Sequence, residues 1–116
     1  MEEKNGESIF IETLGDSPFI KILDILIDGR EFDYTKNDIM ECAEVSKASV
    51  NRILPMLLER GVIKFTRKIG KEKLYILNRN SPIARKIVEL KTIIVNDCID
   101  REIASEPAKE RVTVAH

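Results

Sequence analysis

The stretch that most constrains the fold of this chain is residues 46–61, SKASVNRILPMLLERG. Its apolar residues recur at i, i+3, i+4, i+7 and i+8, which puts them on one face of a helix; they are Val50, Ile53, Leu54, Leu57 and Leu58. Ser46 stands at a good N-cap position, and Gly61 ends the pattern. Small and polar side chains fill the first two turns. One side of this helix is therefore expected to pack on a core, while its N-terminal end stays free to contact a partner.

Pro55 lies in the middle of this helical pattern. An interior proline removes one backbone hydrogen bond and clashes with the carbonyl four residues earlier, here that of Asn51, at a general cost of about 3 kcal/mol. Burial of the neighbouring leucines can offset this cost. We therefore predict a bent but continuous helix, in which residues 46–54 contact the partner and residues 56–60 anchor the helix to the core.

Two shorter helices are predicted upstream. The first begins at Ser17, which can cap, and Pro18, which suits the first helical position; it ends near Gly29. Its expected buried stripe consists of Phe19, Ile20, Leu23, Leu26 and Ile27. The second helix begins after Thr35, which precedes Asp38 by three residues, the spacing of a capping box.

The second of these helices leads directly into residues 46–61. Ile39, Cys42 and Ala43 are expected to point inward, and Val45 to fill the turn before the next cap. A helix, a turn of three or four residues, and a helix with an exposed polar N-terminus are the parts of a helix-turn-helix. The sequence therefore predicts this motif, with residues 46–60 as its second helix.

The remaining N-terminal segments carry weaker patterns. Residues 31–34, Glu-Phe-Asp-Tyr, alternate and precede a cap, so they are expected to form an edge strand. Residues 9–14 form a short apolar patch that is expected to pack on the body as a strand or a turn of helix. Residues 1–8 are expected to be disordered.

A basic β-hairpin is predicted after the helix-turn-helix. Residues 62–68 and 73–77 are rich in β-forming residues and surround a turn at 69–72, where Gly70 supplies the flexibility. Ile63 and Phe65 are expected to face the core. Residues 46–73 carry 8 basic and 2 acidic side chains, whereas residues 1–45 carry 4 basic and 12 acidic ones. The helix and the hairpin therefore share one surface that is suited to an anionic partner.

The longest helical pattern runs from Ile83 to about Ile103 and is wider and longer than one small domain needs. The helix could lie wholly on its own core, but the half far from the hairpin has little left to cover it. We therefore expect a homodimer interface, made of Ile83, Ile87, Leu90, Ile94, Val95, Cys98 and Ile99. Residues 105–116, with Pro107 and alternating charge, are expected to be a flexible tail.

Several function classes are disfavoured. The only histidine is His116, and no nucleotide-binding glycine motif, nucleophile elbow or His-Glu-x-x-His motif occurs, so an enzyme, a metal site and a cofactor are not expected. Cys42 and Cys98 are far apart and form no CxxC pair, which suits a reducing cytoplasm. The start MEEKNGES does not have the pattern of a signal peptide, and no apolar run approaches the roughly 18 residues of a membrane span.

The order of capped helix, turn, helix, basic hairpin and long final helix resembles the winged-helix regulators of the broad ArsR/MarR-like group. The segments IETLGDSPFIKILDILI and RKIGKEKLYILN look most similar to small archaeal members, and the resemblance covers roughly residues 11–95. It implies an α+β, mainly helical fold: a winged helix-turn-helix domain over 9–81 and a C-terminal dimerisation helix over 82–104. It also implies sequence-specific binding of double-stranded DNA as a homodimer.

The resemblance places residues 46–60 in the major groove and the wing, residues 64–73, on the backbone or in the minor groove. Arg52 is the best candidate for guanine, and Asn51 for adenine. The residues implied to contact DNA are Thr35, Ser46, Lys47, Ala48, Ser49, Asn51, Arg52, Arg67, Lys68, Lys71 and Lys73. A transcriptional regulator is thus the leading hypothesis. A winged-helix protein-interaction module of a transcription, replication or chromatin assembly is the alternative, which the acidic first half favours.

Overall fold

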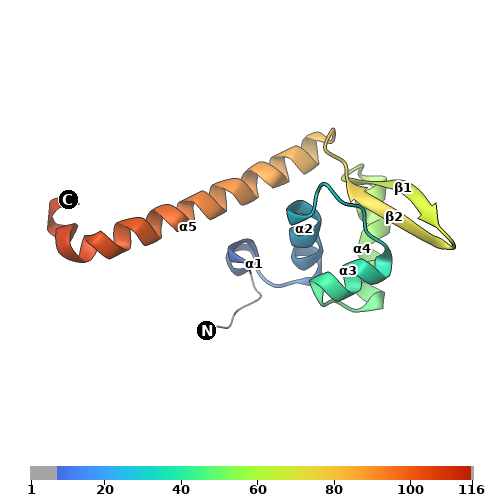
Figure 1. Ribbon diagram of the computed structural model, residues 1–116, viewed down its shortest axis with the longest axis horizontal. Coiled ribbons are helices and arrows are strands. Elements are labelled where there is room, and N and C mark those ends of the chain that lie inside the picture. The colour runs from blue at the N-terminus through green and yellow to red at the C-terminus, as the bar shows by residue number, and fades with distance from the viewer. Residues whose placement is uncertain (1–7, 116) are drawn as a thin grey trace.

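The computed structural model describes the backbone of residues 8–115 and the side chains of residues 8–104. The elements are α1 Ile9–Leu14, α2 Pro18–Asp28, α3 Lys36–Ala43, α4 Lys47–Glu59, β1 Ile63–Ile69, β2 Glu72–Leu77 and α5 Pro82–Ala115. Helices α1 to α4 and the β-hairpin form one lobe, and α5 starts on this lobe and extends away from it (Figure 1). The mainly helical α+β fold and the long final helix predicted from the sequence are confirmed.

The core of the lobe is built from the aliphatic side chains whose periodicity predicted the helices. Helices α2 and α4 contribute the largest share, namely Ile22, Leu23, Leu26, Ile27, Val50, Ile53, Leu54 and Leu57. Phe19 and Ile20 are only partly buried at its edge. Burying one such side chain stabilises the fold by about 1.5–3 kcal/mol, so the inner side of α4 is firmly held.

The short apolar patch after the N-terminus forms helix α1. The hydroxyl of Ser8 accepts a hydrogen bond from the amide of Ile11 at 3.2 Å and caps the helix, and Phe10 is completely buried. Ser8 is thus an ordered residue, although the sequence placed it in a disordered segment. The missed signal is a serine directly before an apolar turn. Residues 1–7 lie outside the described residues.

The predicted caps of the helix-turn-helix are present. Thr35 and Asp38 form both hydrogen bonds of a capping box at 3.0 Å, and the Ser46 hydroxyl accepts from the amide of Ser49 at 3.1 Å. Between them, Glu44 adopts the left-handed conformation with φ 57°, a region that non-glycine residues rarely occupy. This residue ends α3, and the chain turns into α4 within residues 44–46.

The buried face of α3 differs from the prediction at one position. Ile39 and Ala43 are buried as expected, but Cys42 is exposed and Met40 is half-buried. At 100° per residue, Cys42 lies about 60° from Ile39 on the side opposite Ala43, so the core lies on the other flank of the helix. The inward position predicted for Cys42 is therefore wrong.

Helix α4 runs unbroken through Pro55, which confirms the predicted continuity, while the bend stays a prediction. Val50, Ile53 and Leu54 are buried before the proline and Leu57 after it, which supports the helix on both sides of the missing hydrogen bond. The cap at Arg60 donates its amide to the carbonyl of Met56, at 3.0 Å.

No strand forms at residues 31–34. Only Tyr34 pairs with the sheet, through two backbone hydrogen bonds to Tyr75 of 2.8 and 2.9 Å. The turn after α2, in which the amide of Phe32 donates to the carbonyl of Gly29, leaves the side chain of Phe32 65% exposed. The predicted edge strand is therefore reduced to one bridge, because this turn takes up the residues that would have paired.

The two strands form an antiparallel hairpin, the wing, with a register irregularity between Phe65 and Arg67. Ile63 is buried as predicted, but Phe65 is 49% exposed and meets the ring of Tyr75 edge-on at 6.4 Å. Strand β1 buries only its first residue because the rest of it extends past the lobe (Figure 1). The inward orientation predicted for Phe65 is wrong for this reason.

The last helix is longer than predicted. It continues through Pro107 to Ala115, where the sequence indicated a flexible tail from Ser105 onward. A proline removes one backbone hydrogen bond and can bend a helix without ending it. The prediction of a non-helical tail over residues 105–115 is therefore wrong, and His116 lies outside the described residues.

Candidate nucleic-acid interface

The N-terminal half of α4 presents polar and small side chains to solvent. Lys47, Ala48, Asn51 and Arg52 are exposed, while Val50 and Ile53 between them are buried. This alternation holds the helix by one side and leaves the other free over its first two turns. The major groove of DNA is wide enough to admit an α-helix that is exposed in this way.

The two serines at the start of α4 bond to each other. Besides its capping bond, the Ser46 hydroxyl donates to the Ser49 hydroxyl at 3.1 Å. Thr35 is similarly occupied, because its hydroxyl accepts the amide of Asp38. Ser46, Ser49 and Thr35 therefore shape the ends of α3 and α4, and their capacity for a further partner is reduced.

Lys36, a residue that the sequence reasoning missed, lies beside α4. Its Nζ donates to Oδ1 of Asn51 at 2.9 Å. An ammonium group can only donate, so the Asn51 amide must face Lys36 with its oxygen and present its NH₂ group outward. No local pattern in the sequence could reveal this contact, since it joins the first residue of α3 to the N-terminal half of α4.

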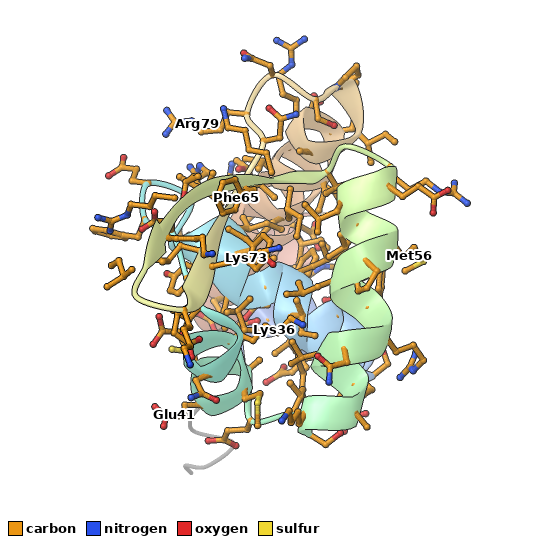
Figure 2. The ribbon with its side chains drawn as sticks, turned by 90° about the vertical axis from the view of Figure 1, so that its right-hand side faces the viewer. Lys36, Glu41, Met56, Phe65, Lys73 and Arg79 are labelled. Carbon is orange, nitrogen blue, oxygen red and sulfur yellow. The ribbon has the colours of Figure 1, made fainter. Side chains whose placement is uncertain are left out.

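Three lysines surround a shallow hollow between α3 and the wing. Lys36, Lys71 and Lys73 line it together with Glu72 and Tyr75. Figure 2 shows Lys36 and Lys73 on one face of the lobe, between the hairpin and α4. Lys71 and Lys73 were predicted as contact residues, and the fold brings them together with Lys36. We call these three residues the lysine hollow. Lys68, the cross-strand partner of Lys73, is exposed and does not line the hollow.

Arg67 has a partner within the chain. Its Nε and one terminal nitrogen donate to the two carboxylate oxygens of Asp33 at 2.9 and 3.2 Å, and the Thr66 hydroxyl donates to the same carboxylate at 2.6 Å. The hydrogen bond from Arg67 is the main cause that lowers the pKa of Asp33 and raises the pKa of Arg67. Arg67 thus ties the wing to the loop after α2.

A second positively charged hollow lies elsewhere on the lobe. Arg30, Arg79 and Arg85 surround an apolar floor that includes Leu77 and Ala84. In Figure 2, Arg79 lies at the upper end of the lobe, well away from Lys36. This hollow is therefore not part of the surface formed by α4 and the lysine hollow.

The apolar residues of α5 fall into two groups. Ile87 and Ile94 pack against the core of their own chain, and Val95 and Cys98 are half-buried. The exposed group consists of Ile83, Leu90, Ile93, Ile99 and Ile103. Of the predicted dimer residues, the lobe already covers four in part: Ile87, Ile94, Val95 and Cys98. No element of the described chain covers the other three, which are Ile83, Leu90 and Ile99.

Other kinds of site find no support among the described residues. No group of three His, Cys, Asp or Glu side chains is placed to hold a metal ion within residues 8–104. Cys42 and Cys98 are both free thiols. Over the described part of the chain, no helix is long and apolar enough to cross a membrane.

A helix-turn-helix followed by a two-stranded wing defines a winged-helix protein. No protein-family model matches the chain, and no curated protein matches it. Solved structures do: MepR of Staphylococcus aureus, described as a transcription regulator of the multidrug efflux pump MepA, is similar with a TM-score of 0.63 and 17% identity, over 97% of this chain and 82% of that one.

Two further winged-helix structures are similar. A cysteine-to-serine mutant of MarR from E. coli has a TM-score of 0.57 and 18% identity, covering 91% of this chain and 77% of that one. ZitR of Lactococcus lactis, solved in complex with DNA, has a TM-score of 0.54 and 18% identity, covering 82% of this chain and 66% of that one. At sequence identities this low, the structural similarity establishes a shared fold and nothing further.

Proposed function

We propose that this chain is a sequence-specific, double-stranded DNA-binding transcriptional regulator that acts as a homodimer in the cytoplasm. The observation that carries the proposal is the exposed first half of α4 beside the lysine hollow, on a winged-helix lobe. MepR and ZitR, which share the fold, are described as a transcription regulator and as a DNA complex. The proposed relationship is to the ArsR/MarR-like group; its small archaeal type remains a prediction from the sequence.

In this proposal α4 enters the major groove and its exposed side chains read base edges. Arg52 is exposed and can donate two hydrogen bonds to O6 and N7 of guanine. Ala48 suits apolar contact with a thymine methyl group, and Lys47 suits a phosphate.

The role of Asn51 is narrower than the sequence suggested. Pairing with adenine requires the amide oxygen to accept from N6, and the bond from Lys36 already uses one of the two lone pairs of that oxygen. While this bond lasts, the N–H donors of Asn51 are fully free and its oxygen can accept one more bond, so acceptors such as guanine O6 or thymine O4 suit it better than adenine does. Lys36→Met is expected to move the base preference at this position toward adenine in a selection from random duplexes, and Lys86→Met on α5 is the matched control.

The wing and the N-termini of α3 and α4 supply backbone contacts. Lys68, Lys71 and Lys73 are exposed on the wing and can neutralise phosphates. Thr35 and Ser46 contribute through the helix N-termini that they cap, where backbone amides attract anions, and Ser49 contributes through its hydrogen bonds to the Ser46 hydroxyl. Arg67 acts mainly through Asp33, by holding the wing in place.

A homodimer would use the exposed apolar residues of α5. A stable interface buries about 1,200–2,000 Å² in total. Ile83 and Leu90 lie on one side of α5, whereas Ile99 lies about half a turn away, so a partner chain would have to contact both sides of the helix. Two copies would place their α4 helices about 34 Å apart, one turn of DNA, so the bound site should be roughly palindromic. Light scattering should give about twice the chain mass of 13.3 kDa.

Binding to duplex DNA at several salt concentrations tests the proposal. If each dimer neutralises about 6–10 phosphates, affinity falls by about 10³–10⁵ between 50 and 200 mM salt. Absence of binding at low salt, or binding that does not respond to salt, would contradict it.

The alternative is a protein-interaction module, which the acidic first half of the chain and the exposed Glu44 favour. The double substitution of Asn51 and Arg52 by alanine separates the two. A DNA reader loses sequence-specific binding while its fold is kept, whereas a module that uses its acidic face retains its partner.

A further inference from the structure

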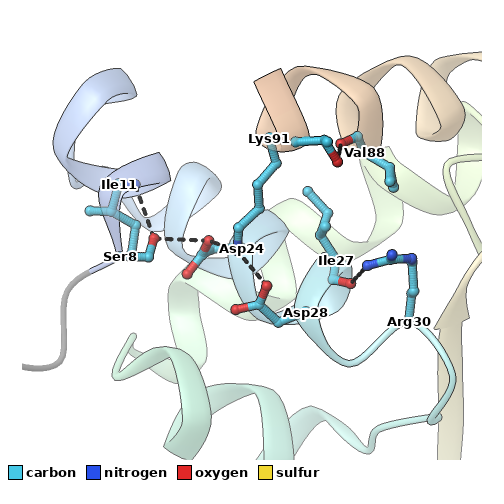
Figure 3. A network of polar contacts seen from close by, with 9 residues as sticks. Ser8, Ile11, Asp24, Ile27, Asp28, Arg30, Val88 and Lys91 are labelled. Atoms are coloured by element: carbon cyan, nitrogen blue, oxygen red, sulfur yellow. Dashed lines mark hydrogen bonds and ion pairs between the residues drawn. The ribbon is translucent and has the colours of Figure 1, made fainter. Parts of the chain in front are cut away.

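A buried charged cluster joins three helices of the chain (Figure 3). Lys91 of α5 donates to one carboxylate oxygen of Asp24 at 2.6 Å and to one of Asp28 at 2.5 Å, both on α2. The Ser8 hydroxyl, which caps α1, donates to the same oxygen of Asp24 at 3.0 Å. The Lys91 ammonium also lies 5.5 Å from the centre of the Phe10 ring. We call this set the Lys91 cluster.

The cluster is set inside the protein and is not a surface ion pair. Lys91 is 8% exposed and Asp24 is 6% exposed, while the Asp28 side chain is largely in solvent. Burying a charge is costly unless it is paired and hydrogen-bonded, and replacing such a pair by apolar residues is often neutral for stability. Its presence at this place is therefore explained better by the geometry that it imposes than by stabilisation.

That geometry is a two-point attachment. Asp24 and Asp28 are four residues apart on α2, one helical turn, and both bind a single ammonium group. Sliding or rotation of α5 along α2 would break one of the two bonds. Apolar contacts such as those of Ile87 and Ile94 have no comparable direction, and they tolerate small shifts.

Because α5 extends far beyond the cluster, a small change of its angle at the cluster moves the far part of the helix by a larger distance. Beyond Cys98, α5 leaves the lobe and projects away from it (Figure 1). From Lys91 to Ile103 the helix rises by about 18 Å, so a tilt of about 10° would move its far part by roughly 3 Å. This is close to the roughly 3.4 Å between successive base pairs.

We propose that the Lys91 cluster is the joint that fixes the angle between α5 and the DNA-binding lobe, and that it thereby sets the spacing of the two half-sites that a dimer recognises. Lys91 and Asp24 are then positioning residues that touch no DNA. The statement about half-site spacing rests on the proposed function; the statement about the joint does not.

The joint can be tested without DNA by a distance measurement within one chain. Cys42 is exposed on α3 and takes one spin label, and Asp100→Cys in a Cys98→Ser background takes the other on α5. Dilution of labelled with unlabelled chains isolates the distance within a chain. We expect one narrow distance distribution for the parent protein and a broader or shifted one for Asp24→Asn/Lys91→Met, which leaves no buried charge unpaired.

Two further variants keep the result interpretable. Asp28→Asn removes only the exposed half of the attachment, so it should fold and should broaden the distribution less. Lys86→Met removes an exposed lysine of α5 that pairs with Glu89, and it should leave the distribution unchanged. An unchanged distribution in both Asp28→Asn and the folded double variant overturns the joint.

The consequence for DNA is measured on duplexes whose half-sites are moved apart or together one base pair at a time. The parent protein should prefer one spacing, and the double variant should prefer a spacing changed by about one base pair or lose the preference. A spacing profile identical to that of the parent and of Lys86→Met overturns the link to half-site spacing. If the parent protein binds no duplex at any salt concentration, the proposed function fails, while the distance measurement still decides the joint.

Discussion

Removal of the lysine hollow should change the salt dependence of DNA binding by a calculable amount. Each neutralised phosphate contributes about 0.9 to the slope of log affinity against log salt concentration. Between 50 and 200 mM salt, one contact is therefore worth about 3.5-fold. If Lys36, Lys71 and Lys73 each contact one phosphate per protomer, a dimer on its two half-sites loses about 5.4 from the slope when all three become methionine. The affinity loss over this salt range then shrinks by about 1,800-fold.

The assay is fluorescence anisotropy of a labelled duplex at four or more salt concentrations. A charge-matched control removes three basic residues away from the N-terminal half of α4, in the variant Arg79→Met/Arg85→Met/Lys86→Met, and thermal unfolding confirms that both proteins fold. The control should keep the slope of the parent protein. An equal loss of slope in both variants would mean that only net charge matters, and an unchanged slope in the lysine variant would remove the hollow from the interface.

Three further predictions concern the fold and the assembly. A Cβ at Gly29 would lie 1.7 Å from the hydroxyl oxygen of Tyr34, so Gly29→Ala should destabilise the protein by about 1–3 kcal/mol in urea unfolding, and adding Tyr34→Phe should recover part of the loss. The pKa of Asp33 lies below its ordinary value of 3.8, so its pair with Arg67 stabilises the fold at neutral pH. This contribution is lost as the pH falls through the lowered pKa of Asp33. Asp33→Asn should therefore flatten the acidic part of the curve of melting temperature against pH. Ile99→Glu should convert a dimer into a monomer of 13.3 kDa in light scattering, with the lobe still folded, and a dimer that persists would contradict the α5 interface.

The features that could be predicted from the sequence are local ones. Caps at Ser17, Thr35 and Ser46 depend on a side chain and an amide three residues later, and the buried stripe of α4 depends on spacings of three and four residues. Both are determined within one turn of helix. The elements of the helix-turn-helix, and the residues exposed at the start of α4, therefore follow from the sequence directly.

The contacts that modify the site are distant in sequence. Lys36 and Asn51 are 15 residues apart, Asp33 and Arg67 are 34 apart, and Lys91 and Asp24 are 67 apart. No periodicity connects such pairs, because each depends on how two elements pack.

The errors at Cys42 and Phe65 have the same origin. Each residue belongs to an element that was correctly predicted, but the side of the element that meets the core is decided by its neighbours. Periodicity identifies a candidate face, and packing determines how far along the element that face is covered.

Helix α5 has more apolar surface than its own lobe can cover, and this affects how the protein responds to dilution. An isolated helix in water is marginal even over about 12–15 residues unless something packs against it. Ile99 and Ile103 are exposed on the part of α5 that has left the lobe. In a dimer, a second chain would supply the missing packing, and the order of this part would become a function of protein concentration. On dilution, circular dichroism should then report a loss of helix before the lobe itself unfolds.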